Sequence, residues 1–420
     1  MNRSFCLSVR RGHLPFALVL GSGLMFGACS TQDTMNKVAP PATTTVAAPT
    51  STAIAAPPAP PVALPHDEAV ASAARQIISG AKLPPGEKLT VVIDPLLDGV
   101  TGAQSVATAA IEKRLVALLK AEFPQVEVKP FNAANIAALP LILVGTFTPV
   151  NLQGKAELER NSYRICFSLA DLKTGKIISK GLAFSKLDGV DSQPLPFFSD
   201  SPVWVSDKVI DGYIRTCQGS KAGDPIHPAY VNTIVAATAI DEAQQAYHAR
   251  KYKEALALYT AALKIPAGDQ PRVQMGIYLS NLKLNRRDSA MQAFANLVRS
   301  GFTSQRLAVK FNFKPGSASF ASDAAIHERW VKVIAKESAQ SPGCVEVAGH
   351  SSRSGSETLN EQVSMLRAEY IKQRMEGEVK TLKQRLTAQG FGSKKAMIGT
   401  GKDDQSDALD RRIEFKPTTC

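Results

Sequence analysis

Residues 31–66 limit where this 420-residue chain can fold, because their composition cannot form a packed core. The segment contains VAPPATTTVAAPTSTAIAAPPAPPVALP, which offers little bulky apolar surface to offset the loss of chain entropy on folding. Proline-rich chains favour an extended conformation at about 3.1 Å per residue, so the segment could reach roughly 110 Å. It predicts a tether, and the globular structure must come from residues 67–420.

The tether follows a segment that is typical of an exported protein. Residues 1–28 begin with basic residues that end in Arg10-Arg11, continue with an apolar stretch and finish with small residues. This is the pattern of a signal peptide. The apolar run from Leu14 to Phe26 has 13 residues. A membrane-spanning helix needs roughly 20, so the run is too short to span a bilayer.

The residues around Cys29 indicate how the exported chain is held. Phe26-Gly27-Ala28-Cys29 resembles a bacterial lipobox, with Phe26 in place of the usual Leu. The resemblance implies cleavage before Cys29 and acylation of this residue. Ser30 follows, where Asp would commonly signal retention in the inner membrane, so the resemblance implies an outer-membrane anchor that faces the periplasm. The alternative is an ordinary secreted protein in which Cys29 is incidental.

Four further cysteines agree with export. They form an even set, which favours disulfides in an oxidising compartment. Four cysteines allow three pairings, and domain membership favours Cys166–Cys217 and Cys344–Cys420. The alternative is a set of free buried thiols. No C-x-x-C occurs and the six histidines are scattered, so we expect no metal site and no cofactor.

Charge and motif content narrow the possible functions. The formal net charge of +12 favours an anionic partner, such as a phospholipid headgroup or an anionic polymer. No stripe of Arg and Lys is interleaved with aromatic residues, so we expect no nucleic acid partner. His350-Ser351-Ser352 fails the G-x-S-x-G hydrolase pattern because residue 353 is Arg. Gly399 to Lys402 fails the P-loop pattern because Ala396 occupies its first glycine position, and we expect no enzyme.

Residues 67–228 are predicted to form a small α/β domain. Strands are expected over residues 89–93, 126–131, 141–147, 163–169 and 176–181, and helices over residues 106–123 and 205–217. Apolar residues alternate with Arg164, Cys166 and Ser168 in the fourth strand, which predicts one buried face. The element order and the phrase Leu143 to Phe147 resemble the periplasmic α/β domain of lipoproteins that activate peptidoglycan synthases.

Residues 236–302 are helical in pattern and contain an internal repeat. Ala255, Tyr259 and Ala262 recur after 35 residues as Ala290, Phe294 and Leu297. This spacing resembles the tetratricopeptide repeat, in which Ala lets paired helices approach beside an aromatic side chain. The resemblance implies a groove that docks an envelope protein. The alternative is a spacer that orients the two flanking domains.

Residues 303–420 alternate strand and helix patterns. A half-buried strand is predicted over residues 307–313, a helix over residues 326–334 and a second strand over residues 345–347. The next helix is expected to face the core with Leu359, Val363, Leu366 and Tyr370. Its neighbouring stripe carries Asn360, Ser364 and Arg367, which packing would not need. That stripe and the loop GHSSRSGS predict a polar notch.

This region resembles the OmpA-like (Pal-like) peptidoglycan-binding domain. VEVAGHSSRSGSETLNEQVSMLRAEYI parallels the family's GHTD-x-x-G loop and its N-x-x-L-S-x-x-R-A-x-x-V helix. Gly390-Phe391-Gly392 matches a later GYG, and Asp410 to Phe415 matches an NRRVE strand. The resemblance implies non-covalent binding of the peptidoglycan stem peptide, with Arg367 gripping a carboxylate of its diamino acid. The binding residues it implies are His350, Ser351, Ser352, Asn360, Ser364, Arg367 and Arg412.

One departure from the family pattern weakens that expectation. The family's Asp, which pairs with the ligand's amine, falls on Ser352 in this chain. Ser352 can hydrogen-bond but supplies no charge. Losing one charge-assisted partner could cost about 1.5–3 kcal/mol, or roughly ten- to hundredfold in affinity.

Together these patterns predict a small α/β domain, a helical repeat and an OmpA-like domain of helices on a sheet. The expected protein is a lipid-anchored outer-membrane protein that binds peptidoglycan and tethers the envelope layers. The alternative is a periplasmic scaffold or regulator, in which residues 67–302 bind an envelope protein and the last domain only localises it.

Overall fold

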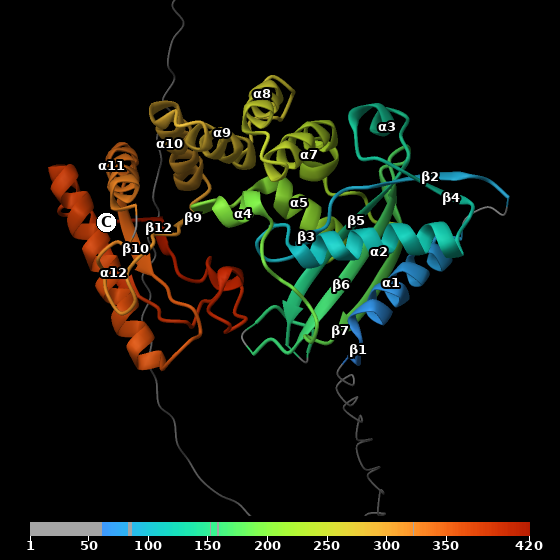
Figure 1. The fold of residues 1–420 in the computed structure, drawn as a ribbon, viewed down its shortest axis with the longest axis horizontal. Helices are drawn as coiled ribbons and strands as arrows, with labels where there is room; N and C mark the ends of the chain where they lie inside the picture. The colour runs from blue at the N-terminus through green and yellow to red at the C-terminus, as the bar shows by residue number, and fades with distance from the viewer. Residues whose placement is uncertain (1–60, 83–85, 152, 158, 322) are drawn as a thin grey trace, which may run out of the picture. The chain divides into compact units, whose positions relative to one another are not determined.

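The computed structural model describes residues 61–420, except residues 83–85, 152, 158 and 322. The predicted signal peptide, Cys29 and nearly all of the tether lie outside the described residues. Within the described part, helices and two β-sheets form a mixed α/β structure (Figure 1). This confirms the predicted multidomain class that combines α/β and α regions.

The first sheet runs in the order β1-β7-β6-β5-β2-β4, with β3 beside β5. Its strands are β1 (Ala63–Leu64), β2 (Leu89–Ile93), β3 (Leu97–Asp98), β4 (Val126–Lys129), β5 (Leu141–Val150), β6 (Ser162–Asp171) and β7 (Lys176–Ser185). Strands β5, β6 and β7 are antiparallel neighbours, whereas β2 pairs in parallel with β4 and β5. The β6–β7 turn closes at Gly175, whose φ of +66° suits glycine.

Helices cover both faces of this sheet. α1 (His66–Gly80) and α2 (Val106–Glu122) share one core with residues of β6 such as Phe167. α3 (Ala133–Ala137), α5 (Lys208–Cys217) and α6 (Pro228–Val231) contribute to the core on the other side. The prediction of a single buried face for the strand of residues 163–169 is therefore wrong. Cys166 and Ser168 are 4% and 0% exposed, because α5 and its neighbours cover the face on which they lie.

The middle of the chain is helical, as predicted. The helices of the predicted region are α7 (Ile234–His248), α8 (Tyr252–Ala262), α9 (Pro271–Lys283) and α10 (Arg287–Thr303). Helix α4 (Pro196–Asp200), which was not predicted, shares their core through Phe197. The residues of the 35-residue repeat are all buried, including Tyr259 and Phe294. Gly276 lets α9 approach α8, since a Cβ there would lie 2.3 Å from the Tyr259 ring.

The second sheet runs in the order β11-β10-β12-β9-β8. Its strands are β8 (Val203–Val205), β9 (Leu307–Val309), β10 (Cys344–Gly349), β11 (Leu386–Gly390) and β12 (Ile413–Thr418). Helices α11 (Ala324–Gln340) and α12 (Glu357–Glu378) and the short 3₁₀ helices Lys380–Leu382 and Gln405–Asp407 complete this region. The strand predicted over residues 307–313 ends at Val309, and it is buried on both faces because Ala308 is only 1% exposed.

Strand β8 joins this sheet from a part of the chain where no strand was predicted, and its last residue, Val205, is the first residue of the predicted helix. It pairs antiparallel with β9, and Trp204 also donates a hydrogen bond of 2.9 Å to the carbonyl of Thr101. The helix expected from residue 205 begins at Lys208, because the Asp207 carboxylate accepts a 2.8 Å hydrogen bond from the Val209 N–H and caps it. Phe294 of α10 and Trp330 of α11 stack in one shared core.

The structure contains both disulfides in the predicted pairing. Cys166–Cys217 joins β6 to α5 and Cys344–Cys420 joins β10 to the chain end, with Cα–Cα distances of 6.1 and 4.9 Å. The second bridge spans 76 residues, so on the chain-entropy model the Cys344→Ser/Cys420→Ser variant should lose roughly 4 kcal/mol of unfolding free energy. Urea denaturation would measure the loss, and non-reducing peptide mapping of the wild type would contradict the account by finding other pairs.

A buried carboxyl where β2 ends makes the stability depend on pH. Burial raises the pKa of Asp94 to about 7. The Tyr230 hydroxyl donates a 2.6 Å hydrogen bond to Asp94, which acts in the opposite direction but does not offset the effect of burial. The folded state therefore keeps a proton that the unfolded chain loses, and stability falls as pH rises from about 4 to about 7. Burial likewise raises the pKa of Glu112 to about 7 and that of Asp241 to about 6.

Asp94→Asn is expected to remove one part of this pH dependence. Relative to wild type, the variant should gain about 4 kcal/mol between pH 4 and pH 8, because each pKa unit corresponds to about 1.4 kcal/mol. Urea denaturation at several pH values measures the difference between the two proteins. A difference that does not change with pH would show that Asp94 is ionised in the folded state.

Candidate functional site

Helix α12 presents a different face to the sheet from the one predicted. Leu359 and Leu366 are 54% and 52% exposed, so the prediction of a core position is wrong for these two; Val363 is half-buried, and Tyr370 packs partly buried against the core. The buried residues are Ser364, Arg367, Ala368, Ile371 and Met375. The cause is close backbone approach at two glycines of the sheet. A Cβ on Gly349 would lie 2.0 Å from the Ser364 carbonyl oxygen, and one on Gly390 would lie 2.5 Å from the Met365 nitrogen.

The polar stripe of α12 is thus part of the packing, contrary to the sequence expectation. The Ser364 hydroxyl accepts a 2.9 Å hydrogen bond from the Gly392 N–H. Arg367 is 9% exposed; its Nε donates to the Ser317 carbonyl at 3.0 Å and its Nη2 to the Lys314 carbonyl at 3.3 Å. Burial lowers the pKa of Arg367, and the charge of Arg411 lowers it further.

Residues 350–355 follow β10 and are here called the His350 loop. Contacts of His350 with Arg412 and Phe391 hold the start of this loop in place. The His350 N–H donates to the Arg412 carbonyl at 2.9 Å, and the His350 ring stacks on Phe391 at 5.3 Å between centroids. Burial lowers the pKa of His350 to about 4, so the ring is neutral at pH 7. Arg412 is 3% exposed and donates to Glu414 at 2.8 Å. A direct ligand contact by His350 or Arg412 stays a prediction.

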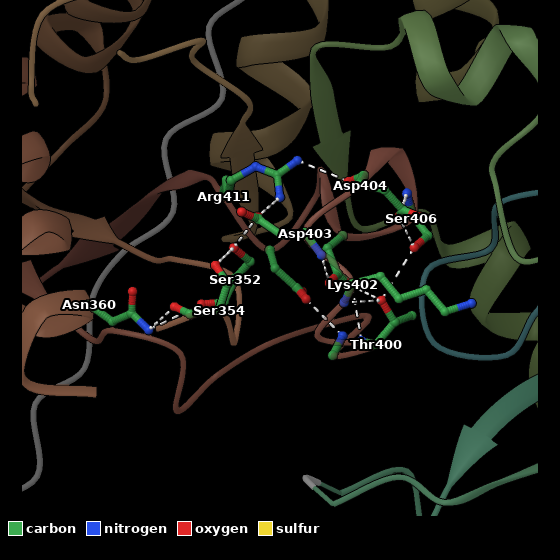
Figure 2. Close-up of polar contacts among 12 residues, drawn as sticks. Ser352, Ser354, Asn360, Thr400, Lys402, Asp403, Asp404, Ser406 and Arg411 are labelled. Atoms are coloured by element: carbon green, nitrogen blue, oxygen red, sulfur yellow. Dashed lines mark hydrogen bonds and ion pairs between the residues drawn. The ribbon is translucent and has the colours of Figure 1, made fainter. Parts of the chain in front are cut away.

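The outer end of the His350 loop brings Ser352 and Asn360 together (Figure 2). Asn360 donates from Nδ2 to the Ser354 carbonyl at 2.9 Å and to the Ser352 carbonyl at 3.4 Å. The Ser351 N–H donates to the Gly392 carbonyl at 2.9 Å, while the Ser351 hydroxyl has no hydrogen-bond partner among the described residues. Within that part of the chain, Arg367 donates to the Ser317 and Lys314 carbonyls and not to this loop.

One neighbour of Ser352, Asp403, was not expected from the sequence. The Ser352 hydroxyl donates a 2.7 Å hydrogen bond to Asp403 Oδ1 (Figure 2). Residues 396–404, here called the Asp403 loop, supply this carboxylate from 51 positions along the chain. Such a separation leaves no local pattern. The pair of glycines at 399 and 401, both with positive φ, is the one local signal of a tightly turned loop.

Residues 312–408 match the model of the OmpA family. This segment is an OmpA-family domain. It includes β10, α12, β11, the His350 loop and the Asp403 loop. The sheet on which it is built also takes strands β8, β9 and β12 from outside the matched residues.

Several solved structures are similar to about a quarter of this chain. The periplasmic domain of MotB from Helicobacter pylori has 16% identity and a TM-score of 0.23, over 27% of this chain and 74% of that one. The cell wall anchor of the T6SS from Pseudomonas aeruginosa has 22% identity and a TM-score of 0.24, over 27% and 81%. The peptidoglycan-associated lipoprotein from Burkholderia pseudomallei has 19% identity and a TM-score of 0.22, over 26% and 89%.

A comparison with curated proteins gives no match. Among the described residues, no helix is both long and apolar enough to cross a membrane. The described residues also contain no group of three or more His, Cys, Asp or Glu side chains that could hold a metal ion.

Proposed function

We propose that the OmpA-family domain binds the stem peptide of peptidoglycan non-covalently and that a lipid on Cys29 anchors the chain in the outer membrane. The protein then tethers the two layers from the periplasmic side. The observation that carries this proposal is the OmpA-family match over residues 312–408, which includes the His350 loop and α12. The chain from Cys29 onwards, without Arg3, Arg10 and Arg11, keeps a formal net charge of +9, which supports the proposal because the wall is an anionic polymer.

Arg367 supplies the cationic half of the proposed site. Two of its nitrogens donate to the carbonyls of Ser317 and Lys314, which fixes the plane of the guanidinium. Phe313 lies against that plane, with its ring centroid 4.9 Å away. The third nitrogen, Nη1, has no acceptor among the described residues and is left for a ligand carboxylate. A fixed guanidinium loses little freedom when such a ligand arrives.

The tether and the domains before the wall-binding region have their own proposed roles. Residues 29–62 span the distance from the membrane; the predicted tether ended at residue 66, but Ala63–Leu64 form β1 and α1 begins at His66. Residues 67–228 and 236–302 form an α/β domain and a tetratricopeptide-like repeat. Together residues 67–302 offer a surface to an envelope protein. No catalytic role is proposed for any of the three folded regions.

One contact favours the second candidate function, a periplasmic scaffold or regulator of an envelope complex. Arg160, from the loop between β5 and β6, donates from Nη1 to the Met397 carbonyl at 2.7 Å and also to the Ile398 carbonyl. Burial lowers the pKa of Arg160. A partner that engages residues 67–228 could therefore alter the Asp403 loop, and with it the wall-binding region.

Titration with a soluble stem peptide tests the proposed binding. A chain from residue 30 onwards should bind a peptide that ends in the diamino acid, and amidation of the carboxylate on that residue should abolish the heat of binding in calorimetry. Equal binding of the two peptides would contradict the role of Arg367. The absence of binding by a folded chain would contradict the function itself.

A further inference from the structure

The OmpA-family domain lacks an acidic residue in the His350 loop, where Ser352 stands in place of the family's Asp. A ligand with an ammonium group still needs an anionic partner nearby. We infer that Asp403 is that partner, so that the anionic half of the site comes from the Asp403 loop. This inference rests on the proposed function and names the residue that recognises the ammonium group of the diamino acid.

Hydrogen bonds join the Asp403 carboxylate to the His350 loop and, through that loop, to α12. Ser352 donates to Asp403 Oδ1 at 2.7 Å, and the Ser352 and Ser354 hydroxyls lie 3.3 Å apart. Asn360 of α12 donates to the Ser354 carbonyl at 2.9 Å (Figure 2). Ser352, which stands at the position of the family's Asp, thus connects that position to the carboxylate of Asp403. A carboxylate in hydrogen-bond contact with Ser352 can serve a ligand that approaches Ser352.

The Asp403 carboxylate is charged and open to a ligand. Its side chain is 49% exposed. Partial burial raises its pKa, but the hydrogen bond from Ser352 and the positive charge of Arg411 outweigh burial and leave the pKa below its usual value. Arg411 Nη1 lies 2.6 Å from Oδ1. Because such a half-exposed pair is worth only about 0–1 kcal/mol, a ligand ammonium can share or displace it.

Two buried aspartates hold the Asp403 loop in place before any ligand binds. Asp410 accepts hydrogen bonds of 2.6, 2.8 and 2.7 Å from the N–H groups of Met397, Ile398 and Gly399. Asp407 accepts from the Thr400 N–H at 2.9 Å and from the Asp403 N–H at 3.1 Å. Both aspartates are 0% exposed. The carboxylate of Asp403 is therefore preorganised, which reduces the ordering cost of binding.

A separate observation points to a ligand beside Ser352. Ser351 is only 5% exposed, yet its hydroxyl has no hydrogen-bond partner among the described residues. A buried hydroxyl without a partner is unfavourable unless a water or a ligand satisfies it. Among the described residues the hydroxyls of Ser168, Ser280 and Ser338 are also buried without a partner, but Ser351 is the one next to Ser352. Ser351 directly precedes the residue that contacts Asp403. A polar ligand group at this point would satisfy the hydroxyl.

The first test uses the chain from residue 30 onwards and purified sacculi. Asp403→Asn should weaken sacculus binding about ten- to hundredfold, because a neutral amide loses the charge-assisted contact. Asp404→Asn is the matched control: the neighbouring carboxylate accepts from the Ser406 N–H at 2.8 Å, on the other side of the loop, and binding should not change. Thermal melts show whether each variant is folded.

A second variant, in which the carboxylate is moved from residue 403 to residue 352, tests the inference even if Asp403→Asn alters the Asp403 loop. Ser352→Asp combined with Asp403→Asn should restore binding, since it returns the carboxylate to the His350 loop. Ser352→Asp alone should not tighten binding, because two carboxylates so close cannot both ionise. From the sequence alone, Ser352→Asp would be expected to tighten binding, because it restores the charge of the family's Asp; the presence of Asp403 changes that expectation.

Chemical modification of the ligand separates the inference from the proposed function. Acetylation of the ammonium group of a soluble stem peptide should weaken binding to wild type about tenfold or more and should leave binding to Asp403→Asn unchanged. If wild type binds sacculi and Asp403→Asn binds equally well, the inference is wrong while the function stands. If folded wild type binds neither sacculi nor peptide, both are wrong.

Discussion

Arg367→Ala is expected to remove at least a hundredfold of sacculus affinity and also to lower the stability of the OmpA-family domain. The affinity falls because the charged contact that Arg367 Nη1 offers to a ligand carboxylate is lost. The stability falls because two partly buried hydrogen bonds, to the carbonyls of Ser317 and Lys314, are lost, at about 0.5–1.5 kcal/mol for each. Sacculus sedimentation measures the first effect and urea denaturation the second.

A matched arginine separates lost contact from lost stability. Arg385 donates to the carbonyls of Gly343 at 2.7 Å and Ala339 at 3.2 Å, also from the second-sheet region but not to the His350 loop. Arg385→Ala should therefore lower stability and leave binding intact. Arg367→Lys should recover part of the stability and little of the binding, because an ammonium lacks the planar fork. Equal loss of binding in the two alanine variants would assign the effect of Arg367→Ala to unfolding.

Cys29→Ser is expected to move the whole protein from the membrane pellet to the soluble periplasmic fraction. Each buried CH₂ of an acyl chain contributes about 0.8 kcal/mol to membrane attachment, so a chain without the acylated residue loses most of its affinity for the membrane. Cys6→Ser is the matched control, since Cys6 lies inside the predicted signal peptide and its replacement should leave the protein in the pellet. A Cys29→Ser protein that stays in the pellet would contradict lipid anchoring.

Local sequence patterns were sufficient to predict the boundaries of elements that begin or end because of residues close by in the sequence. The run from Leu89 to Ile93 is a strand from end to end, because β-branched residues stop at Asp94-Pro95. Helix α2 begins after Ser105, whose hydroxyl accepts from the Thr108 N–H at 3.2 Å in a capping box. In both cases the signal lies within a few residues of the boundary.

The orientation of α12 could not be predicted from periodicity. Leu359 and Leu366 dominate the apolar pattern, so the pattern points the helix towards them. The actual orientation depends on Gly349 of β10 and Gly390 of β11, where the lack of a side chain lets the backbone of α12 pack closely against the sheet. Periodicity records side-chain polarity and not the distance between two backbones.

Contacts between distant segments were equally hidden. Strand β8 is three residues long, and its partner β9 lies about a hundred residues further along the chain. The hydrogen bond from Ser352 to Asp403 likewise joins two loops that share no pattern. The sequence located the His350 loop and Arg367 as candidate residues, but the acidic neighbour became visible only once the two loops were brought together.

Sedimentation with purified sacculi tests the central claim most directly. A chain from residue 30 onwards lacks the proposed lipid, so any pelleting depends on the wall alone. We predict that the folded chain pellets with sacculi and that excess soluble stem peptide releases it. A folded chain that remains in the supernatant, at the ionic strength where a known wall-binding control protein pellets, would contradict peptidoglycan binding by the OmpA-family domain.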